Sequence, residues 1–155
     1  MLGMIIAIVV FNVIALLKVR NLSINQIVHI IVFTIAFQTL VDLYLDFKYH
    51  AYWYYSKAVD LRSIPTLIMI IPAVNVMFLN WYPLERSLMK QTLYIICWTI
   101  SLLMYESFAL LPGPWGYFHY GWWKLGYSAI VDPILLITLV LYYKWIRKIE
   151  KNQAN

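Results

Sequence analysis

The sequence predicts an all-α fold, a single bundle of five membrane-spanning helices that occupies residues 1–155. Two observations predict this fold class. Of the 155 residues, 63% are hydrophobic and only 12% are charged, which is typical of a chain that folds in lipid. Apolar segments also recur five times at the roughly 20-residue length with which a helix crosses a bilayer. No second domain, internal repeat or low-complexity stretch is indicated.

The first two helices are expected over residues 2–19 and 24–46. The first segment resembles a signal peptide only in its position, because no basic residue precedes its apolar core and no small-residue cleavage site follows it. We therefore expect a retained helix. The longest connection, residues 47–61, contains Tyr-Trp-Tyr-Tyr at 52–55, which indicates a segment that rests at the membrane interface.

The remaining helices are expected over residues 62–82, 88–110 and 123–145. A short link joins the third helix to the fourth, so these two should be antiparallel neighbours. Leu-Pro-Gly-Pro-Trp-Gly at 111–116 breaks the fourth helix. An aromatic-rich stretch follows this breaker and leads into the fifth helix, as in a second interfacial belt.

Basic residues are distributed unequally between the two sides of this bundle. Eight lie on one side, namely Lys18, Arg20, Arg86, Lys90, Lys144, Arg147, Lys148 and Lys151. Four lie on the other side, namely Lys48, Lys57, Arg62 and Lys124. The positive-inside rule assigns the richer side to the cytoplasm. We therefore expect an external N-terminus and a cytoplasmic C-terminus.

This topology gathers most of the acidic residues in the outer half of the membrane. Glu106 and Asp132 lie inside apolar spans, where a charged side chain costs roughly 2.5–3.5 kcal/mol and usually has a partner or a function. Asp42 and Asp46 are four residues apart and share a helix face, so they repel each other unless a proton, a cation or a basic side chain intervenes. These four acids are candidates for ligand binding or proton relay.

Two prolines lie beside polar residues within the spans. Pro133 follows Asp132 and leaves the carbonyl of Ala129 without its helical donor, which predicts a polar pocket beside the acid. Pro72 should free the carbonyl of Ile68 in the same way, and Asn75 lies one turn further on to supply an amide. The alternative is that both kinks only shape the bundle.

Further candidates lie near the outer membrane interface. Asp60 and Arg62 open the third helix, and Arg62 is a candidate partner for the aspartates of the second helix. The glycine-bounded stretch 116–123 is either an aromatic belt or a lid over the acidic pocket. Within it, His119 is a candidate pH sensor or proton relay, and Trp122 is a candidate pocket residue.

Other kinds of chemistry lack support in the sequence. No spacing of His, Cys, Asp and Glu predicts a metal site, and no motif predicts a cofactor. The net charge of +5 does not indicate nucleic-acid binding, because no basic stripe with interleaved aromatics is present. Cys97 is the only cysteine, so it forms no internal disulfide, and a packing role is expected.

Several short motifs resemble a known group of proteins. Asn-Trp-Tyr-Pro at 80–83, Trp98, Glu106 and the stretch from His119 to Ser128 are similar to those of a family of small five-helix integral membrane proteins of endospore-forming, Bacillus-type bacteria. The similarity covers most of the chain from the second helix onward. It implies a multi-pass protein of the bacterial cytoplasmic membrane and supplies no catalytic residue.

Three functions remain open. The favoured one is the binding or sensing of a membrane lipid, an isoprenoid or another small amphiphile in an acidic, aromatic-lined pocket in the outer half of the membrane. The second is a proton- or cation-coupled transporter, working as a homo-oligomer because five helices enclose little pathway. The third is a membrane-embedded enzyme with Asp132 or Glu106 as general acid and Asp42 or His119 as base.

Overall fold

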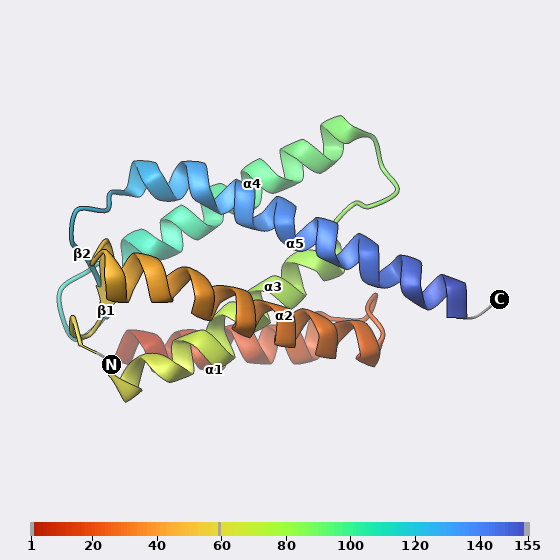
Figure 1. Ribbon diagram of the computed structural model, residues 1–155. Coiled ribbons are helices and arrows are strands. Elements are labelled where there is room, and N and C mark those ends of the chain that lie inside the picture. Colours follow the sequence, from red (N-terminus) through yellow and green to blue (C-terminus); the bar gives the residue numbers. More distant parts are fainter. Residues whose placement is uncertain (1, 59, 154–155) are drawn as a thin grey trace.

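The computed structural model of the chain describes residues 2–58 and 60–153. Five helices form one bundle, and a two-stranded antiparallel sheet covers one end of it (Figure 1). The elements are α1 (Leu2–Lys18), α2 (Ile24–Asp42), β1 (Tyr52–Tyr54), α3 (Ile71–Trp81), α4 (Leu88–Ala109), β2 (Phe118–Tyr120) and α5 (Leu125–Gln153). The predicted all-α fold is confirmed, with five α-helices within the described residues.

Four helical stretches are long and apolar enough to cross a membrane. They are Ile24–Lys48, Leu61–Trp81, Leu88–Ala109 and Leu125–Gln153. With 17 residues, α1 is about 26 Å long at 1.5 Å per residue, slightly less than the ~30 Å hydrocarbon core. The chain is therefore a helical membrane protein by length and composition, and the predicted fifth crossing depends on α1.

The second and third predicted helices change helix type along their length. After Asp42, α2 continues as a π-helical segment, Leu43–Lys48. The third begins with a 3₁₀ turn and a π-helical segment, Thr66–Ile70, before α3. Pro72 is the second residue of α3, which directly follows the π-helical segment. At this proline the helix changes from π- to α-helical hydrogen bonding.

The fifth helix is longer than predicted. It extends to Gln153, eight residues beyond the expected end at residue 145. Near this end, Glu150 accepts hydrogen bonds from Asn25 Nδ2 at 2.7 Å and from the side chain of Gln26. The last turns of α5 therefore dock on the first turn of α2, which explains why the helix continues beyond the apolar segment.

The two aromatic segments expected to be separate interfacial belts pair with each other. Tyr52 lies opposite Tyr120 and Trp53 opposite His119, so the prediction of helices alone missed this small sheet. Alternate residues of a strand point to opposite faces. Tyr52 and Phe118 are buried against the bundle, whereas His119 is exposed.

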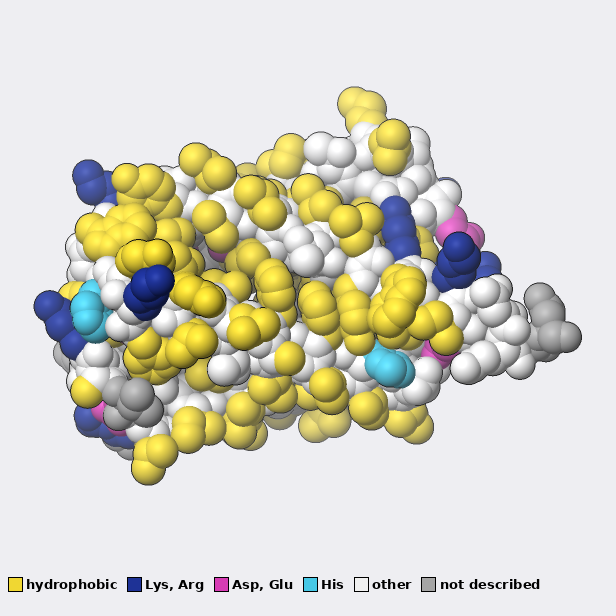
Figure 2. Space-filling model, in the orientation of Figure 1, with side chains coloured by type: hydrophobic (Ala, Val, Ile, Leu, Met, Phe, Trp, Pro, Cys, Tyr) yellow, Lys and Arg dark blue, Asp and Glu magenta, His cyan; other side chains and the backbone are white. Residues whose placement is uncertain are grey.

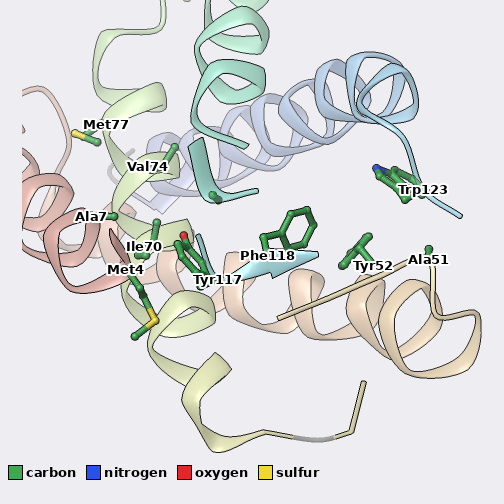
Figure 3. Packing of buried hydrophobic residues seen from close by; sticks show 11 residues of the cluster. Met4, Ala7, Ala51, Tyr52, Ile70, Val74, Met77, Tyr117, Phe118 and Trp123 are labelled. Atoms are coloured by element: carbon green, nitrogen blue, oxygen red, sulfur yellow. The ribbon is translucent and has the colours of Figure 1, made fainter. Parts of the chain in front are cut away.

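Hydrophobic side chains pack in two clusters along the bundle. One lies beneath the strands, where Tyr52, Tyr117, Phe118 and Trp123 meet side chains of α1 and α3 (Figure 3). The other, centred on Phe78, joins α2, α3 and α5 in the opposite half. Many large apolar side chains are exposed around the bundle, and Figure 2 shows them along its length with basic groups near both ends. This surface suits a lipid environment.

Candidate functional site

A cavity of about 240 Å³ lies inside the half of the bundle that the strands cover. Its walls come from α2, α3, α4 and α5, the two π-helical segments and both strands. Most of the lining is apolar or aromatic, and a few polar groups are interspersed. This combination is typical of a small-molecule site.

Each of these four helices presents one face to the cavity. From α5 the lining residues are Ser128, Val131, Asp132, Leu135, Leu136 and Leu139, spaced by three and four positions as on one side of a helix. The cavity wall from α4 has the same spacing and includes Glu106. The two acids that the sequence places inside apolar spans therefore line the same cavity, from neighbouring helices.

Glu106 is held by a chain of hydrogen bonds. Its Oε1 atom accepts from the Tyr120 hydroxyl at 2.7 Å and from the Ser128 hydroxyl at 2.7 Å. Ser128 in turn accepts from Trp123 Nε1 at 2.8 Å. The chain connects α4, α5 and the strand β2, and it fixes one carboxylate oxygen. The other oxygen, Oε2, has no hydrogen bond to the residues that the structure describes.

Asp132 is less restrained than Glu106. It lines the cavity one helical turn after Ser128, and no described residue forms a hydrogen bond or an ion pair with it. Among the residues that the structure describes, no Lys, Arg or His lines the cavity. A carboxylate in an apolar wall is costly without compensation. Two carboxyl groups thus share this cavity without a basic side chain.

A second acidic group lies behind the cavity wall. Asp42 is 2% exposed, and its Oδ1 atom accepts from the Tyr52 hydroxyl at 2.6 Å and from Gln38 Nε2 at 3.0 Å. Its Oδ2 atom and Oδ1 of Asp46 are buried without a hydrogen-bond partner in the described chain. Tyr52 and Gln38 line the cavity, whereas the two aspartates do not. Asp42 is linked to the cavity through these two side chains.

Tyrosine hydroxyls surround the strand end of the cavity. Burial and the neighbouring Asp42 carboxylate raise the pKa of Tyr52 and of Tyr54 well above the ordinary value. Burial likewise raises the pKa of Tyr117, whose hydroxyl is hydrogen-bonded to that of Tyr105. These phenols stay protonated at neutral pH, and the Tyr52 hydroxyl donates to Asp42. The Tyr54 hydroxyl has no hydrogen bond to any described residue.

Asp60 and Arg62 lie outside the cavity. Their side chains form an ion pair at 2.6 Å, and the guanidinium also lies over the Tyr55 ring, 5.2 Å from its centroid. The hydrogen bonds from Arg62 lower the pKa of Asp60. Arg62 is therefore not the partner of Asp42 and Asp46 that the sequence suggested.

His119 and Trp122 also lie outside the cavity. His119 is exposed and stacks on Trp53, with ring centroids 6.1 Å apart. Trp122 is 51% exposed and donates from Nε1 to the Tyr49 carbonyl at 2.9 Å. The aromatic stretch does reach the cavity, but through its inward-facing residues Phe118 and Trp123.

Asn75 lines the cavity and donates to Thr34 Oγ1 at 3.0 Å, which joins α3 to α2. The carbonyl groups that the prolines were expected to free do not supply polar groups there. Ile68 and Ala129 are both exposed, and neither lines the cavity. The polarity of the cavity comes from side chains instead, so this expectation is wrong.

Sequence reasoning missed several polar residues of the site, namely Gln38, Tyr52, Tyr54, Thr66, Tyr120 and Ser128. Two of them carried a signal, because Gln38 and Ser128 each lie four residues before an aspartate and so share its helix face. The tyrosines of the strands carried none. Their position depends on pairing between segments more than 60 residues apart, which local pattern does not reveal.

Neither metal chemistry nor similarity to other proteins identifies the site further. Within residues 2–58 and 60–153, no group of three or more His, Cys, Asp or Glu side chains is placed to hold a metal ion. Comparison of the chain with protein-family models, curated proteins and solved structures finds no match. The fold and site define a helical membrane protein with an acidic cavity, and its function must be inferred from that cavity.

Proposed function

We propose that this protein binds or senses a lipid, an isoprenoid or another small amphiphile in the cavity between α2, α3, α4 and α5. The observation that carries the proposal is the pairing of Glu106 and Asp132 with a wall that is otherwise mainly apolar and aromatic. An amphiphile has the matching composition, because its chain contacts the apolar wall and its head group reaches the polar end.

Access from the membrane supports this proposal. On the face shown in Figure 2, the surface is hollowed between α2 and the first half of α5, and some acidic surface is visible among hydrophobic side chains. Phe37 from α2 and Leu135 from α5 line the cavity and are only half-buried. A molecule with a hydrocarbon chain could enter sideways from the lipid without passing through water.

Transport is less well supported by this conformation. Below the cavity, Leu136 and Leu139 belong both to its lining and to the second hydrophobic cluster. That cluster is built on fully buried Phe78 and Ile30, and Val76, Leu79 and Val140 add further apolar side chains to it. A proton- or cation-coupled transporter needs polar groups that reach both faces. We therefore favour ligand binding over transport as the function. As the sequence resemblance implies, we place the protein in a bacterial cytoplasmic membrane.

Native mass spectrometry of the gently extracted protein tests the proposal. Wild type is compared with Asp132→Asn and Glu106→Gln, which remove charge at nearly constant volume. We expect a defined amphiphile to be retained by wild type and to be depleted by about tenfold or more in Asp132→Asn, since a hydrogen bond to a charged group contributes roughly 1.5–3 kcal/mol.

Glu85→Gln is the matched control, because the Glu85 side chain is 86% exposed and lies far from the cavity. It should retain the adduct as wild type does. If no adduct is found with any folded variant, even after amphiphiles are added, the binding proposal fails. An adduct that is equally abundant in all four proteins would place the ligand elsewhere.

A further inference from the structure

We propose that the head group of the ligand is a monovalent organic cation, an ammonium group on a hydrocarbon chain, and that the cavity rejects anionic and zwitterionic phosphate head groups. This inference rests on the proposed function and specifies the ligand class. It starts from the charge of the cavity. Glu106 and Asp132 both line it, whereas no Lys, Arg or His of the described chain does.

Unused hydrogen-bonding groups give an independent indication of a ligand. Thr66 is 3% exposed, lines the cavity, and its Oγ1 atom has no partner among the described residues. A buried polar group without a partner costs roughly 1–3 kcal/mol. Asp132 and the Tyr54 hydroxyl also lack hydrogen bonds in the described chain. A ligand that brings N–H groups would supply donors to the carboxylate and the hydroxyl oxygens.

Aromatic rings strengthen the preference for a cation. Tyr52, Tyr105, Phe118 and Trp123 all line the cavity, and the rings of Tyr52 and Trp123 meet edge to face with centroids 5.8 Å apart. The faces of such rings attract ammonium groups, and aromatic cages recognise quaternary ammonium ligands. Rings together with carboxylates form a site for a positive charge attached to a hydrocarbon.

The same charges disfavour a phospholipid head group. A phosphate beside Glu106 and Asp132 would meet two carboxylates and no basic side chain, which is a repulsive arrangement in a medium of low dielectric constant. Arg62, the basic side chain that the sequence suggested as a partner for the acids, is paired with Asp60 outside the cavity. Phosphatidylethanolamine carries an ammonium group but also a phosphate, so a simple amine amphiphile fits better.

Binding of four probes with the same ten-carbon chain tests the charge preference. They are decylamine, decyltrimethylammonium, decanol and decanoate, and short-chain phosphatidylethanolamine is a fifth probe. Each is titrated at pH 7 into purified protein in a neutral detergent, and the tryptophan fluorescence of the protein is followed. We expect decylamine, whose N–H groups can pair with the carboxylates and the unpartnered hydroxyl oxygens, to bind at least about tenfold more tightly than decanol. Decyltrimethylammonium has no N–H group, so it should bind more tightly than decanol through its charge and the aromatic rings but less tightly than decylamine. Decanoate and the phospholipid should bind least.

Four variants distinguish an effect of the Asp132 charge on binding from an effect of misfolding. Asp132→Asn should lose the preference for cations over decanol, Asp132→Glu should keep it, and Glu85→Gln should bind as wild type does. Val131→Phe, which fills the cavity from α5, should weaken the binding of every probe. Retention of the cation preference by Asp132→Asn overturns the inference.

The failure of this inference is distinguishable from failure of the proposed function. If decanol or decanoate binds as tightly as the cations and Val131→Phe abolishes that binding, the cavity holds an amphiphile but does not select a positive charge. If none of the five probes binds to wild type, both the inference and the proposed function are wrong. If phosphatidylethanolamine binds as tightly as decylamine, the ligand is a lipid head group and the rejection of phosphate is wrong.

Discussion

Ser128 is the residue on which the geometry of the site depends most directly. Its hydroxyl accepts a hydrogen bond from Trp123 and donates one to Glu106, so one small side chain links the aromatic end of the cavity to its carboxylate. Ser128 is itself 3% exposed.

Ser128→Ala should destabilise the protein by about 1 kcal/mol, the usual magnitude for a hydrogen bond between membrane helices. The change leaves the Trp123 N–H without its acceptor and removes one donor from Glu106. Thermal unfolding in detergent, followed by tryptophan fluorescence, measures the effect. Ser107→Ala is the control, because Ser107 is exposed and, within residues 2–58 and 60–153, its hydroxyl bonds only to the Leu103 carbonyl of its own helix. Equal melting temperatures for the two variants would contradict this role.

At the scale of elements, the strand pair closes the cavity because glycine permits a close approach. A Cβ atom at Gly121 would collide with the carbonyl oxygen of His50, and contacts with Ala51 would also be tight. The Gly121 N–H donates to the Ala51 carbonyl at 2.8 Å. The turn after β2 is thereby fixed against the turn that follows the π-helical end of α2.

Gly121→Ala should therefore destabilise the protein by about 2 kcal/mol or more, in the range of substitutions that force backbone atoms apart. Gly126→Ala is the matched control, since nothing lies within 4 Å of a Cβ at Gly126 and alanine favours the helix. Circular dichroism during heating compares the two variants. If the Gly121→Ala and Gly126→Ala proteins have the same melting temperature, the strand pair is not held by this close approach.

The sequence predicted the helices far better than the elements between them. The limits of α1 and α4 agree with the predicted ranges 2–19 and 88–110 to within one residue, because long apolar runs determine them. The strands were missed since neither forms without the other. The final turns of α5 were missed because they depend on Glu150 meeting the start of α2.

The candidate site was predictable to a similar degree. An acid inside an apolar span is visible in the sequence, and Glu106 and Asp132 line the cavity. Acids and aromatics near the interface were ambiguous, because which way they face depends on strand pairing. Alternation along β2 turns Phe118 inward and His119 outward, which the sequence alone did not resolve.

At the scale of the whole molecule, the two ends of the bundle differ in charge and shape. The start of α1 lies at the same end as the strands, whereas α5 finishes at the opposite end (Figure 1). The strand end holds the cavity and its acids. The other end carries the larger group of Lys and Arg residues, including Lys144, Arg147 and Lys148, so the positive-inside rule predicts that it faces the cytoplasm.

Cysteine labelling tests this orientation. It thereby also tests which leaflet of the membrane holds the cavity. Two cysteine substitutions are made, each in a Cys97→Ala background. Lys57→Cys places a thiol in the loop after β1, and Lys148→Cys places one on the last turns of α5. Lys57 and Lys148 are both exposed. A membrane-impermeant maleimide added to intact cells should label Lys57→Cys and should label Lys148→Cys only after the cells are permeabilised. The background protein itself is the control. The reverse pattern would place the cavity in the cytoplasmic leaflet, and amphiphiles would then reach it from inside the cell.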